Sequence, residues 1–262
     1  MGGDNPLCVI VGPCSYENKK LVTSVAEALK DITDSLDVNF IFKNSYSKAN
    51  RTSLHSFTGR TLEEALSTYH EIHKTLGCPV LTDCHDEYQV KLVAPWVQML
   101  QLPAFLFRQT DLVIALGRTG LPINVKKAQF AAPEDMKYVI EKIQFTGNNN
   151  ILLTERGSCF GFHDLVVDFR SFPIMSSFGF PTGIDCSHSN QKIGSDSTTK
   201  AGPREYAALY ARCAVAAGCD FLFLETHPNP PEALSDSACM VYLDSVEALL
   251  KDCLAIRSTL TL

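Results

Sequence analysis

The run Cys8-Val9-Ile10-Val11-Gly12 is apolar along its whole length and leads directly into Pro13 and Cys14. A strand that is apolar on both faces is typical of a parallel sheet covered by helices. Seven similar runs follow along the chain, and we predict that all eight are strands. They span Cys8–Gly12, Val38–Lys43, Pro79–Thr82, Val97–Leu102, Pro122–Val125, Ile151–Thr154, Thr182–Cys186 and Phe221–Leu224.

Helical patterns separate these runs. Between the first two, apolar residues recur at spacings of three and four from Val22 to Leu36. Thr61 and Glu64 have the spacing of a capping box, and the helix that follows them is expected to end at Gly77. Further helices are expected after Pro133, over Pro203–Ala217 and from Val246 to Ile256.

Eight strand–helix units in 262 residues favour a (β/α)8 barrel, because a closed barrel of this type needs about 250 residues. We therefore predict one domain over residues 1–262. A doubly wound open sheet is the alternative fold. It loses support because the sequence contains neither the G-x-G-x-x-G nor the G-x-x-x-x-G-K motif of nucleotide-binding sheets.

Composition excludes several classes of protein. A hydrophobic fraction of 45% and a charged fraction of 20% are typical of globular domains. The net charge of −6 argues against a nucleic-acid partner or an anionic membrane surface. We find neither an apolar run long enough to span a membrane nor a secretory signal, so we expect a cytoplasmic protein. Ten cysteines without a C-x-x-C pair fit reduced, buried thiols.

Reactive residue types gather where the predicted strands end, which is where a barrel carries its chemistry. Reading each strand to its carboxyl end gives Cys14, Lys43, Asp83 with His85, Gln101, Lys126, Arg156, Asp185 with His188, and Glu225. The spacing of Asp83 and His85 puts both on one face of an extended chain, so we expect Asp83 to orient His85 or both to line the pocket.

Cationic side chains are concentrated in or near these loops although the protein is acidic overall. They are Lys43, Lys48, Arg51, Arg108, Lys126, Lys127, Arg156 and Arg204. As a set they favour a doubly anionic or two-phosphate substrate. The alternative for each one is a solvated surface charge or the partner of a nearby acid.

A second set of residues at the strand ends consists of side chains that commonly bind metal ions. Cys14, His188 and Glu225 end the first, seventh and eighth strands, which are neighbours in a closed barrel, and Asp236 follows on the next loop. A thiolate, an imidazole and two carboxylates suit a divalent ion such as Zn²⁺, Fe²⁺ or Mn²⁺. Each residue also has a plain structural alternative: a buried thiol, a loop histidine, a helix cap.

At this point the sequence resembles the 3-deoxy-D-manno-octulosonate 8-phosphate synthase family over nearly its whole length. The similar segments include Gly12-Pro13-Cys14, Phe42-Lys43, residues 48–53, residues 101–106, residues 108–112, residues 124–127, Glu155-Arg156-Gly157, Phe160-Gly161, residues 185–188, residues 225–228 and residues 234–236. The segment Lys48-Ala49-Asn50-Arg51 separates this family from the related 3-deoxy-arabino-heptulosonate 7-phosphate synthases.

The resemblance implies a barrel that condenses phosphoenolpyruvate with D-arabinose 5-phosphate and water and releases phosphate. A cysteine at position 14 is typical of the metal-dependent group, with Cys14, His188, Glu225 and Asp236 as ligands. Implied phosphoenolpyruvate contacts are Lys43, Lys48, Lys126 and Arg156. Implied sugar-phosphate contacts are Asn50 and Arg51, next to Thr52, which replaces a common serine but keeps the hydroxyl.

Other implied roles concern assembly and proton transfer. Phe105 and Arg108 correspond to residues that reach a neighbouring subunit's site in a homotetramer. We also predict Gln101 as a substrate contact. His85 and Asp236 are expected to carry protons, and they join Cys14, His188 and Lys48 as the predicted catalytic residues.

Three other functions remain open from the sequence. The nearest is a heptulosonate synthase, which takes erythrose 4-phosphate in place of arabinose 5-phosphate. A metal-dependent barrel hydrolase is weaker, since the first strand does not end in H-x-H. The third is a non-catalytic phosphosugar sensor that has kept the pocket.

Overall fold

Eight parallel strands form a closed ring in the computed structural model, which describes residues 2, 5–49, 54–59, 61–159, 164–191 and 204–260. Each strand pairs with the next along the chain, and the last pairs with the first, Cys8 lying opposite Phe221. The strands are β1 (Cys8–Gly12), β2 (Asn39–Lys43), β3 (Val80–Asp83), β4 (Met99–Leu102), β5 (Ile123–Lys126), β6 (Ile151–Glu155), β7 (Thr182–Asp185) and β8 (Phe221–His227). The predicted (β/α)8 barrel is confirmed, and the open sheet is excluded.

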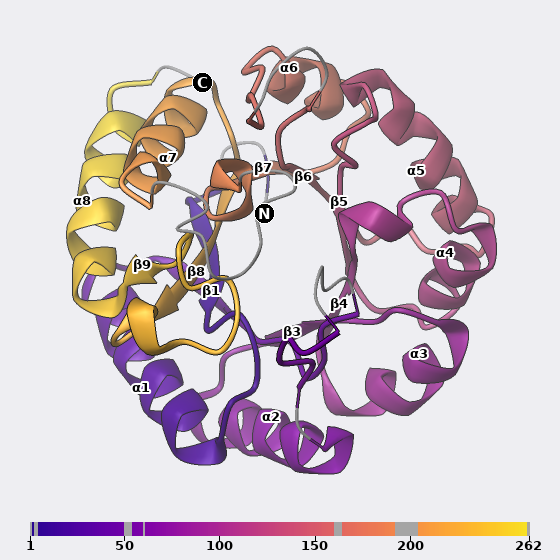
Figure 1. Ribbon diagram of the computed structural model, residues 1–262. Helices are drawn as coiled ribbons and strands as arrows, with labels where there is room; N and C mark the ends of the chain where they lie inside the picture. The colour runs from indigo at the N-terminus through magenta and orange to yellow at the C-terminus, as the bar shows by residue number, and fades with distance from the viewer. Residues whose placement is uncertain are drawn as a thin grey trace.

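Helices surround this ring on the outside, as Figure 1 shows. They are α1 (Lys19–Ser35), α2 (Leu62–Leu76), α3 (Glu87–Val93), α4 (Thr110–Gly117), α5 (Met136–Gln144), α6 (Ser171–Ser176), α7 (Tyr206–Ala216) and α8 (Val246–Arg257). Among the described residues no helix is both long and apolar enough to cross a membrane.

The start of α2 differs from the predicted capping box. Thr61 is the N-cap residue, but within the described part of the chain its side chain makes no capping hydrogen bond. Glu64 instead accepts a hydrogen bond from the hydroxyl of Tyr16 at 3.2 Å, so a tertiary contact replaces the local one. The other end of the helix is as expected, because Gly77 terminates it with φ of 68°.

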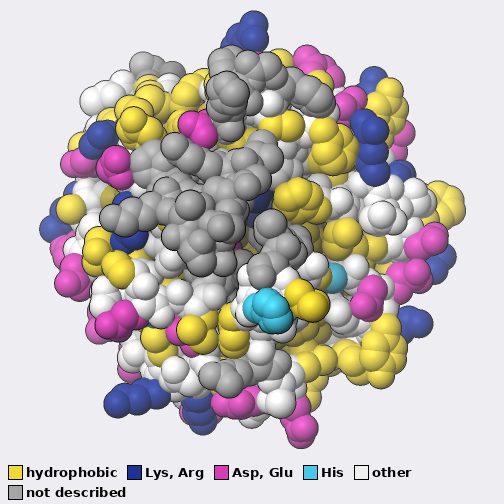
Figure 2. Space-filling model, in the orientation of Figure 1, with side chains coloured by type: hydrophobic (Ala, Val, Ile, Leu, Met, Phe, Trp, Pro, Cys, Tyr) yellow, Lys and Arg dark blue, Asp and Glu magenta, His cyan; other side chains and the backbone are white. Residues whose placement is uncertain are grey.

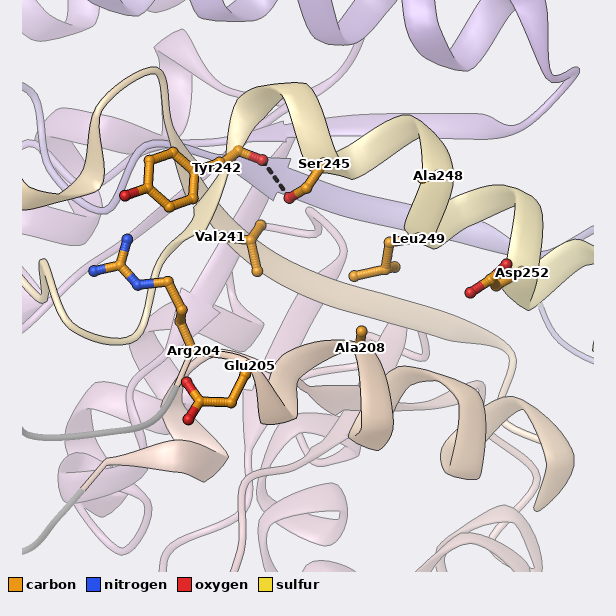
Figure 3. Close-up of a pocket in the computed structure, with 9 residues that line it drawn as sticks. All are labelled: Arg204, Glu205, Ala208, Val241, Tyr242, Ser245, Ala248, Leu249 and Asp252. Carbon is orange, nitrogen blue, oxygen red and sulfur yellow. Dashed lines mark hydrogen bonds between the residues drawn. The ribbon is translucent and has the colours of Figure 1, made fainter.

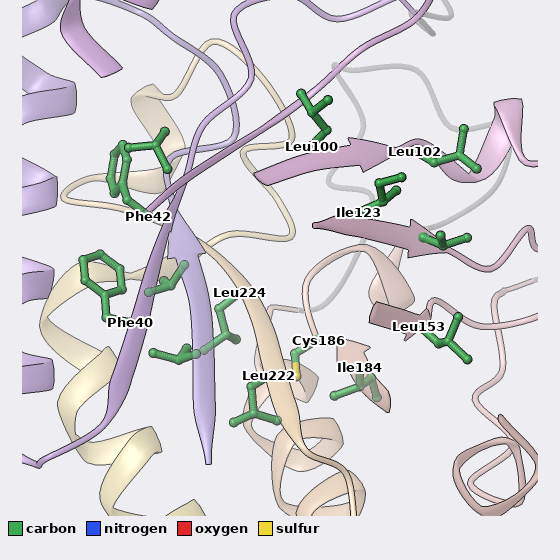
Figure 4. Close-up of a cluster of buried hydrophobic side chains, with 14 of the residues drawn as sticks. Phe40, Phe42, Leu100, Leu102, Ile123, Leu153, Ile184, Cys186, Leu222 and Leu224 are labelled. Atoms are coloured by element: carbon green, nitrogen blue, oxygen red, sulfur yellow. The ribbon is translucent and has the colours of Figure 1, made fainter. Parts of the chain in front are cut away.

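Alternate residues of every strand face opposite sides of the sheet and build two apolar layers. One side packs between the barrel and its helices and includes Phe40, Phe42, Leu222 and Leu224, which appear with their neighbours in Figure 4. The other side fills the barrel and consists of Cys8, Ile10, Ile41, Leu81, Met99, Leu152, Phe221 and Phe223. Burial on both faces explains why the strands read as continuous apolar runs.

On β2, β5 and β8 the inward-facing series becomes polar towards the carboxyl end of the strand. Lys43 follows Ile41, Lys126 follows Asn124, and Glu225 follows Phe223, each two residues further along the inner face. A shift of one residue in register would turn these groups into the helix layer. Gly12 has a related role, because a Cβ there would lie 2.0 Å from the carbonyl oxygen of Lys43. The missing side chain lets the start of the Cys14 loop pass beside β2.

A ninth strand, β9 (Val241–Tyr242), was not predicted. It is only two residues long and pairs in parallel with the end of β8, at Thr226 and His227. The hydroxyl of Thr226 also donates to the carbonyl of Val241 at 3.0 Å. These contacts hold the carboxyl-terminal end of the loop that contains Asp236 against the end of β8.

Candidate active site

The carboxyl ends of the eight strands enclose one end of the barrel, which we call its mouth. The mouth contains a set of buried polar side chains. Lys43, Asp83, Gln101, Lys126, Arg156, Asp185 and Glu225 are all buried there. The ring of Phe223 lies beneath them, with Lys126 Nζ 3.0 Å from its centroid and Lys43 Nζ 5.6 Å from it. An apolar floor under buried charges creates the low-dielectric setting in which electrostatic interactions are strongest.

Four candidate ligands converge at this mouth from three separate parts of the chain. One ligand atom from each of Cys14, His188, Glu225 and Asp236 lies within 4.8 Å of all the others. Cys14 Sγ is 3.0 Å from Asp236 Oδ2, and His188 Nε2 is 3.4 Å from Glu225 Oε2. Asp236 has φ of 47°, a conformation that few residues other than glycine adopt. The convergence expected from the strand ends is therefore present.

The contacts of His188 and Glu225 fit a bound cation. His188 Nδ1 lies 2.8 Å from Asp185 Oδ2, so its hydrogen is assigned to that nitrogen and the lone pair of Nε2 points towards Glu225. Glu225 Oε2 is buried and has no hydrogen-bond partner among the described residues. These two electron-rich atoms lie 3.4 Å apart, and His188 and Glu225 would together hold a divalent ion. The donor set suits Zn²⁺, Fe²⁺ or Mn²⁺.

The thiol of Cys14 supports the same conclusion. Burial, followed by the charges of Asp236 and Glu225, raises the pKa of this thiol well above its ordinary value. A thiol in such surroundings stays protonated unless a cation joins it, and a metal ion removes the proton outright. Ser235 adds a contact on the other side, with its Oγ 3.1 Å from Cys14 Sγ and 3.1 Å from Asp236 Oδ2.

The cations of the mouth are largely paired with these acids. Lys43 forms an ion pair with Glu225, and Lys126 Nζ lies 2.7 Å from Asp185 Oδ2. Lys48 Nζ donates to Ser45 Oγ at 2.9 Å and lies 3.9 Å from Glu225. Pairing with a nearby acid, the alternative given for each cation, therefore holds for Lys43 and Lys126.

Burial lowers the pKa of Lys126 to about 8. The positive charges of Lys43 and Arg156 also lower this pKa, whereas the charge and hydrogen bond of Asp185 raise it. Arg156 itself donates from Nη2 to Gln191 Oε1 at 2.7 Å. Its Nη1 is buried and has no hydrogen-bond partner in the described part of the chain. A guanidinium with an unused buried donor is suited to an incoming anion.

His85 is held by two acceptors. Its Nε2 lies 3.0 Å from Asp83 Oδ2, and its Nδ1 lies 3.1 Å from Gln89 Oε1. That amide oxygen also accepts from Tyr46 OH and from the backbone N–H of His85, so both ring nitrogens face acceptors. Burial alone would lower the pKa of His85. The hydrogen bond and the charge of Asp83 outweigh burial, and the pKa of His85 is raised. The pair expected from the spacing is present, and it favours the imidazolium.

Two of the predicted residues lie at the rim and not among the buried groups. Arg108 is mostly exposed, with its guanidinium 3.8 Å from Asp135. Phe105 is 55% exposed, and its ring lies 5.7 Å from the guanidinium of Arg156 in its own chain. Gln101 lies inside the barrel, where it accepts from Asn124 Nδ2 at 3.0 Å.

Asn50, Arg51 and Thr52, the predicted sugar-phosphate contacts, lie outside the described residues.

Lys127, although adjacent to Lys126, does not face the mouth. It is fully buried on the other side of the strand end, with Nζ 3.3 Å from Glu155 Oε1. Glu155 Oε1 also accepts from the backbone N–H groups of Arg156 (2.9 Å) and Gly157 (2.6 Å). Lys127 and Glu155 therefore hold the turn that aims Arg156. Gln191 was not predicted, and its only sequence signal is its position three residues after His188.

A separate cavity of about 300 Å³ lies between α7 and α8, outside the barrel (Figure 3). Apolar groups such as Val241 and Leu249 line it together with Arg204, which donates to the carbonyl of Ser237 at 3.0 Å. Apart from Arg204, a cation noted near the loops, its lining includes none of the residues predicted for the site. Arg204 therefore supports the loop next to Asp236 from outside the mouth.

Comparisons with known proteins agree with this geometry. The model of the DAHP synthetase I family matches residues 1–259. A 2-dehydro-3-deoxyphosphooctonate aldolase of Cyanothece sp. is 49% identical over 260 residues, covering 99% of this chain and 95% of the relative. Proteins of the same name from Geobacter sulfurreducens (47%; 98% and 94% covered) and Bartonella henselae (45%; 94% and 88% covered) are also similar.

Proposed function

The chain belongs to the DAHP synthetase I family, and on that premise we propose that it condenses phosphoenolpyruvate with D-arabinose 5-phosphate and water. The products are 3-deoxy-D-manno-octulosonate 8-phosphate and inorganic phosphate. One observation carries the proposal: four metal-ligand atoms within 4.8 Å of one another stand beside buried cations at the end of the barrel where such enzymes do their chemistry.

Phosphoenolpyruvate carries a phosphate and a carboxylate, and the mouth offers donors for both. Arg156 has a buried Nη1 that lacks a partner among the described residues, so it is the proposed anchor. Lys43 and Lys126 lie on the same inner face, and Lys48 adds a third ammonium group near Glu225. Lys43 and Lys126 are already paired with Glu225 and Asp185. The oxygens of the substrate would therefore share these two ammonium groups with the acids and would not neutralise unpaired charges.

Cys14, His188, Glu225 and Asp236 are the residues that would hold a divalent ion. When bound, such an ion supplies Lewis acidity and a fixed point for orienting the aldehyde end of the sugar. Asp185 keeps His188 in the tautomer that ligation requires, since it accepts from Nδ1 and from the backbone N–H of the same residue at 2.9 Å.

The bond changes define what the side chains must do. Carbon 3 of phosphoenolpyruvate bonds to the aldehyde carbon, whose oxygen takes a proton, while positive charge develops at carbon 2. Water adds its oxygen to carbon 2 and gives up one proton, which balances the proton taken up by the aldehyde oxygen. The new hydroxyl then loses its proton as the carbonyl at carbon 2 forms, and phosphate leaves with the electron pair of the bond between carbon 2 and the bridging oxygen and takes up that proton. His85, protonated and oriented by Asp83, is the proposed proton donor, and Asp236 is the second candidate.

The sugar phosphate is proposed to contact Asn50, Arg51 and Thr52. By the family resemblance, Phe105 and Arg108 would serve a neighbouring subunit's site in a homotetramer. Their exposure is consistent with that role, and Figure 2 has hydrophobic side chains gathered beside the mouth where β4 to β6 end. Basic and acidic side chains are mixed around the rest of that face.

We also propose a cytoplasmic location and a role in supplying the sugar of lipopolysaccharide. All ten cysteines are free thiols and most are buried, which is typical of a reducing compartment.

Release of phosphate tests the proposed reaction. We expect phosphate only when phosphoenolpyruvate and arabinose 5-phosphate are present together, and much less with erythrose 4-phosphate. In water enriched in oxygen-18 the label should enter the eight-carbon product and not the phosphate, because the bond between carbon 2 and oxygen breaks. Faster release with erythrose 4-phosphate indicates a heptulosonate synthase, and label in phosphate indicates hydrolysis. No release with either sugar favours a sensor.

A further inference from the structure

Gln191 connects two parts of the mouth that the proposed function uses separately. It follows the short 3₁₀ turn of residues His188–Asn190, and its backbone N–H donates to the carbonyl of His188 at 3.1 Å. Its side-chain Oε1 accepts from Arg156 Nη2 at 2.7 Å, and its Nε2 donates to Asp236 Oδ1 at 2.9 Å. One amide therefore joins an anion-binding guanidinium to a candidate metal ligand.

The orientation of this amide is fixed by its two partners. If it were turned by 180°, its NH₂ group would face the guanidinium and its oxygen would face the carboxylate, and both contacts would be repulsive. A carboxamide is suited to this position because one planar group supplies both an acceptor and a donor. Asparagine, one methylene shorter, does not span the same two partners.

The two carboxylate oxygens of Asp236 have different partners. Oδ1 accepts from Gln191, whereas Oδ2 lies near Cys14 Sγ (3.0 Å) and Ser235 Oγ (3.1 Å). Gln191 thus turns Oδ2 towards the other candidate ligands. On the opposite side it holds Nη2 of Arg156 and leaves the buried Nη1 for an anion.

We propose that Gln191 is a positioning residue that makes the metal and phosphoenolpyruvate bind cooperatively, an inference that rests on the proposed function. A cation at Asp236 weakens that carboxylate as an acceptor, which reduces the electron density that Gln191 Oε1 offers to Arg156. The guanidinium then donates more strongly to the substrate. Coupling of this kind is reciprocal, so phosphoenolpyruvate must tighten the metal by the same factor.

Cobalt is a suitable probe, because a Co²⁺–thiolate bond from Cys14 gives a charge-transfer absorbance that needs no turnover. The Kd for Co²⁺ is measured by this absorbance with and without saturating phosphoenolpyruvate, in the absence of sugar. Calorimetry gives the Kd for phosphoenolpyruvate with and without Co²⁺. We expect the wild-type protein to show the same coupling factor in both titrations, roughly 5- to 20-fold.

Gln191→Met removes both hydrogen bonds and should reduce the factor to about the twofold or less that direct attraction between the charges supplies. Gln191→Asn should lower the coupling factor to a similar value. Because asparagine is also a carboxamide, this second variant keeps the test valid if Gln191→Met does not fold. Gln144→Met makes the same chemical change at an exposed glutamine that bonds Asn149. It should keep the wild-type factor, with melting temperatures showing that all variants are folded.

The outcomes separate this inference from the proposed function. Unchanged coupling in folded Gln191→Met or Gln191→Asn overturns the role of Gln191, as does a wild-type protein that binds both ligands independently. A wild-type protein that gives no Co²⁺–thiolate absorbance removes Cys14 from the ligand set. The proposed metal site then fails first, and the cooperativity fails with it.

Discussion

Lys126 and Lys127 are adjacent in the chain and face opposite sides of the barrel wall, so methionine at each position should have a different effect. Lys127 is fully buried, and its Nζ lies 3.3 Å from Glu155 Oε1. It also lies within 3.2–3.3 Å of acceptors on Ala128, Ala131, Gly157 and Ser158. Lys127→Met leaves Glu155 as a buried carboxylate without its cation and removes the ammonium donor that these acceptors share.

The free energy of unfolding should fall by about 3–5 kcal/mol, the usual loss when one partner of a buried ion pair is removed. For a chain of this size that corresponds to a melting temperature lower by about 6–20 °C. Lys126→Met should lose less stability, because burial already lowers the pKa of Lys126 and Asp185 keeps its bonds to His188. It should instead abolish tight binding of phosphoenolpyruvate, measured by calorimetry.

Urea and thermal unfolding of both variants test this pair of expectations. The double variant Lys127→Met/Glu155→Gln should be more stable than Lys127→Met alone, because it removes the orphaned charge. The reasoning is refuted if Lys127→Met unfolds at the wild-type urea concentration, or if Lys126→Met is the less stable of the two.

Three further predictions concern the mouth. Cys14→Ser should remove the Co²⁺–thiolate absorbance and weaken Co²⁺ binding at least tenfold, as seen by titration; an unchanged spectrum would contradict the ligand assignment. Asp83→Asn should move the loss of kcat/KM with rising pH to lower pH, because Asp83 raises the pKa of His85 and so keeps its proton to higher pH; a pH profile that does not move counts against His85 as donor. Binding of phosphoenolpyruvate should weaken as pH rises through about 8, where Lys126 loses its proton, and Lys126→Arg should flatten that dependence in calorimetric titrations; equal slopes would rule Lys126 out.

The barrel could be predicted because its repeating unit leaves a strong signal in the sequence. Strands β1 and β8 contain continuous apolar runs, and the inner face of β8 becomes polar at its carboxyl end. That change of character also located Lys43 and Glu225. The two-residue β9 could not be predicted, because its pairing depends on where the loop after β8 returns.

The arrangement within the mouth was less accessible to sequence reasoning. Two adjacent lysines look alike in a sequence, and only the register of β5 decides that Lys126 faces inward while Lys127 is buried against Glu155. The two contacts of Gln191 join residues 35 and 45 positions apart in the chain. Long-range hydrogen bonds of this kind leave no local pattern. The convergence of Cys14 with His188 was predictable because strand order alone makes β1 and β8 neighbours and puts β7 next to β8.

The most direct measurement is the rate of phosphate release from phosphoenolpyruvate and arabinose 5-phosphate by metal-loaded protein, before and after a chelator. The expected result is rapid release that stops on chelation, returns on adding the divalent ion, and is absent in Cys14→Ser at any stage. Full turnover by protein shown to be free of metal would contradict the account.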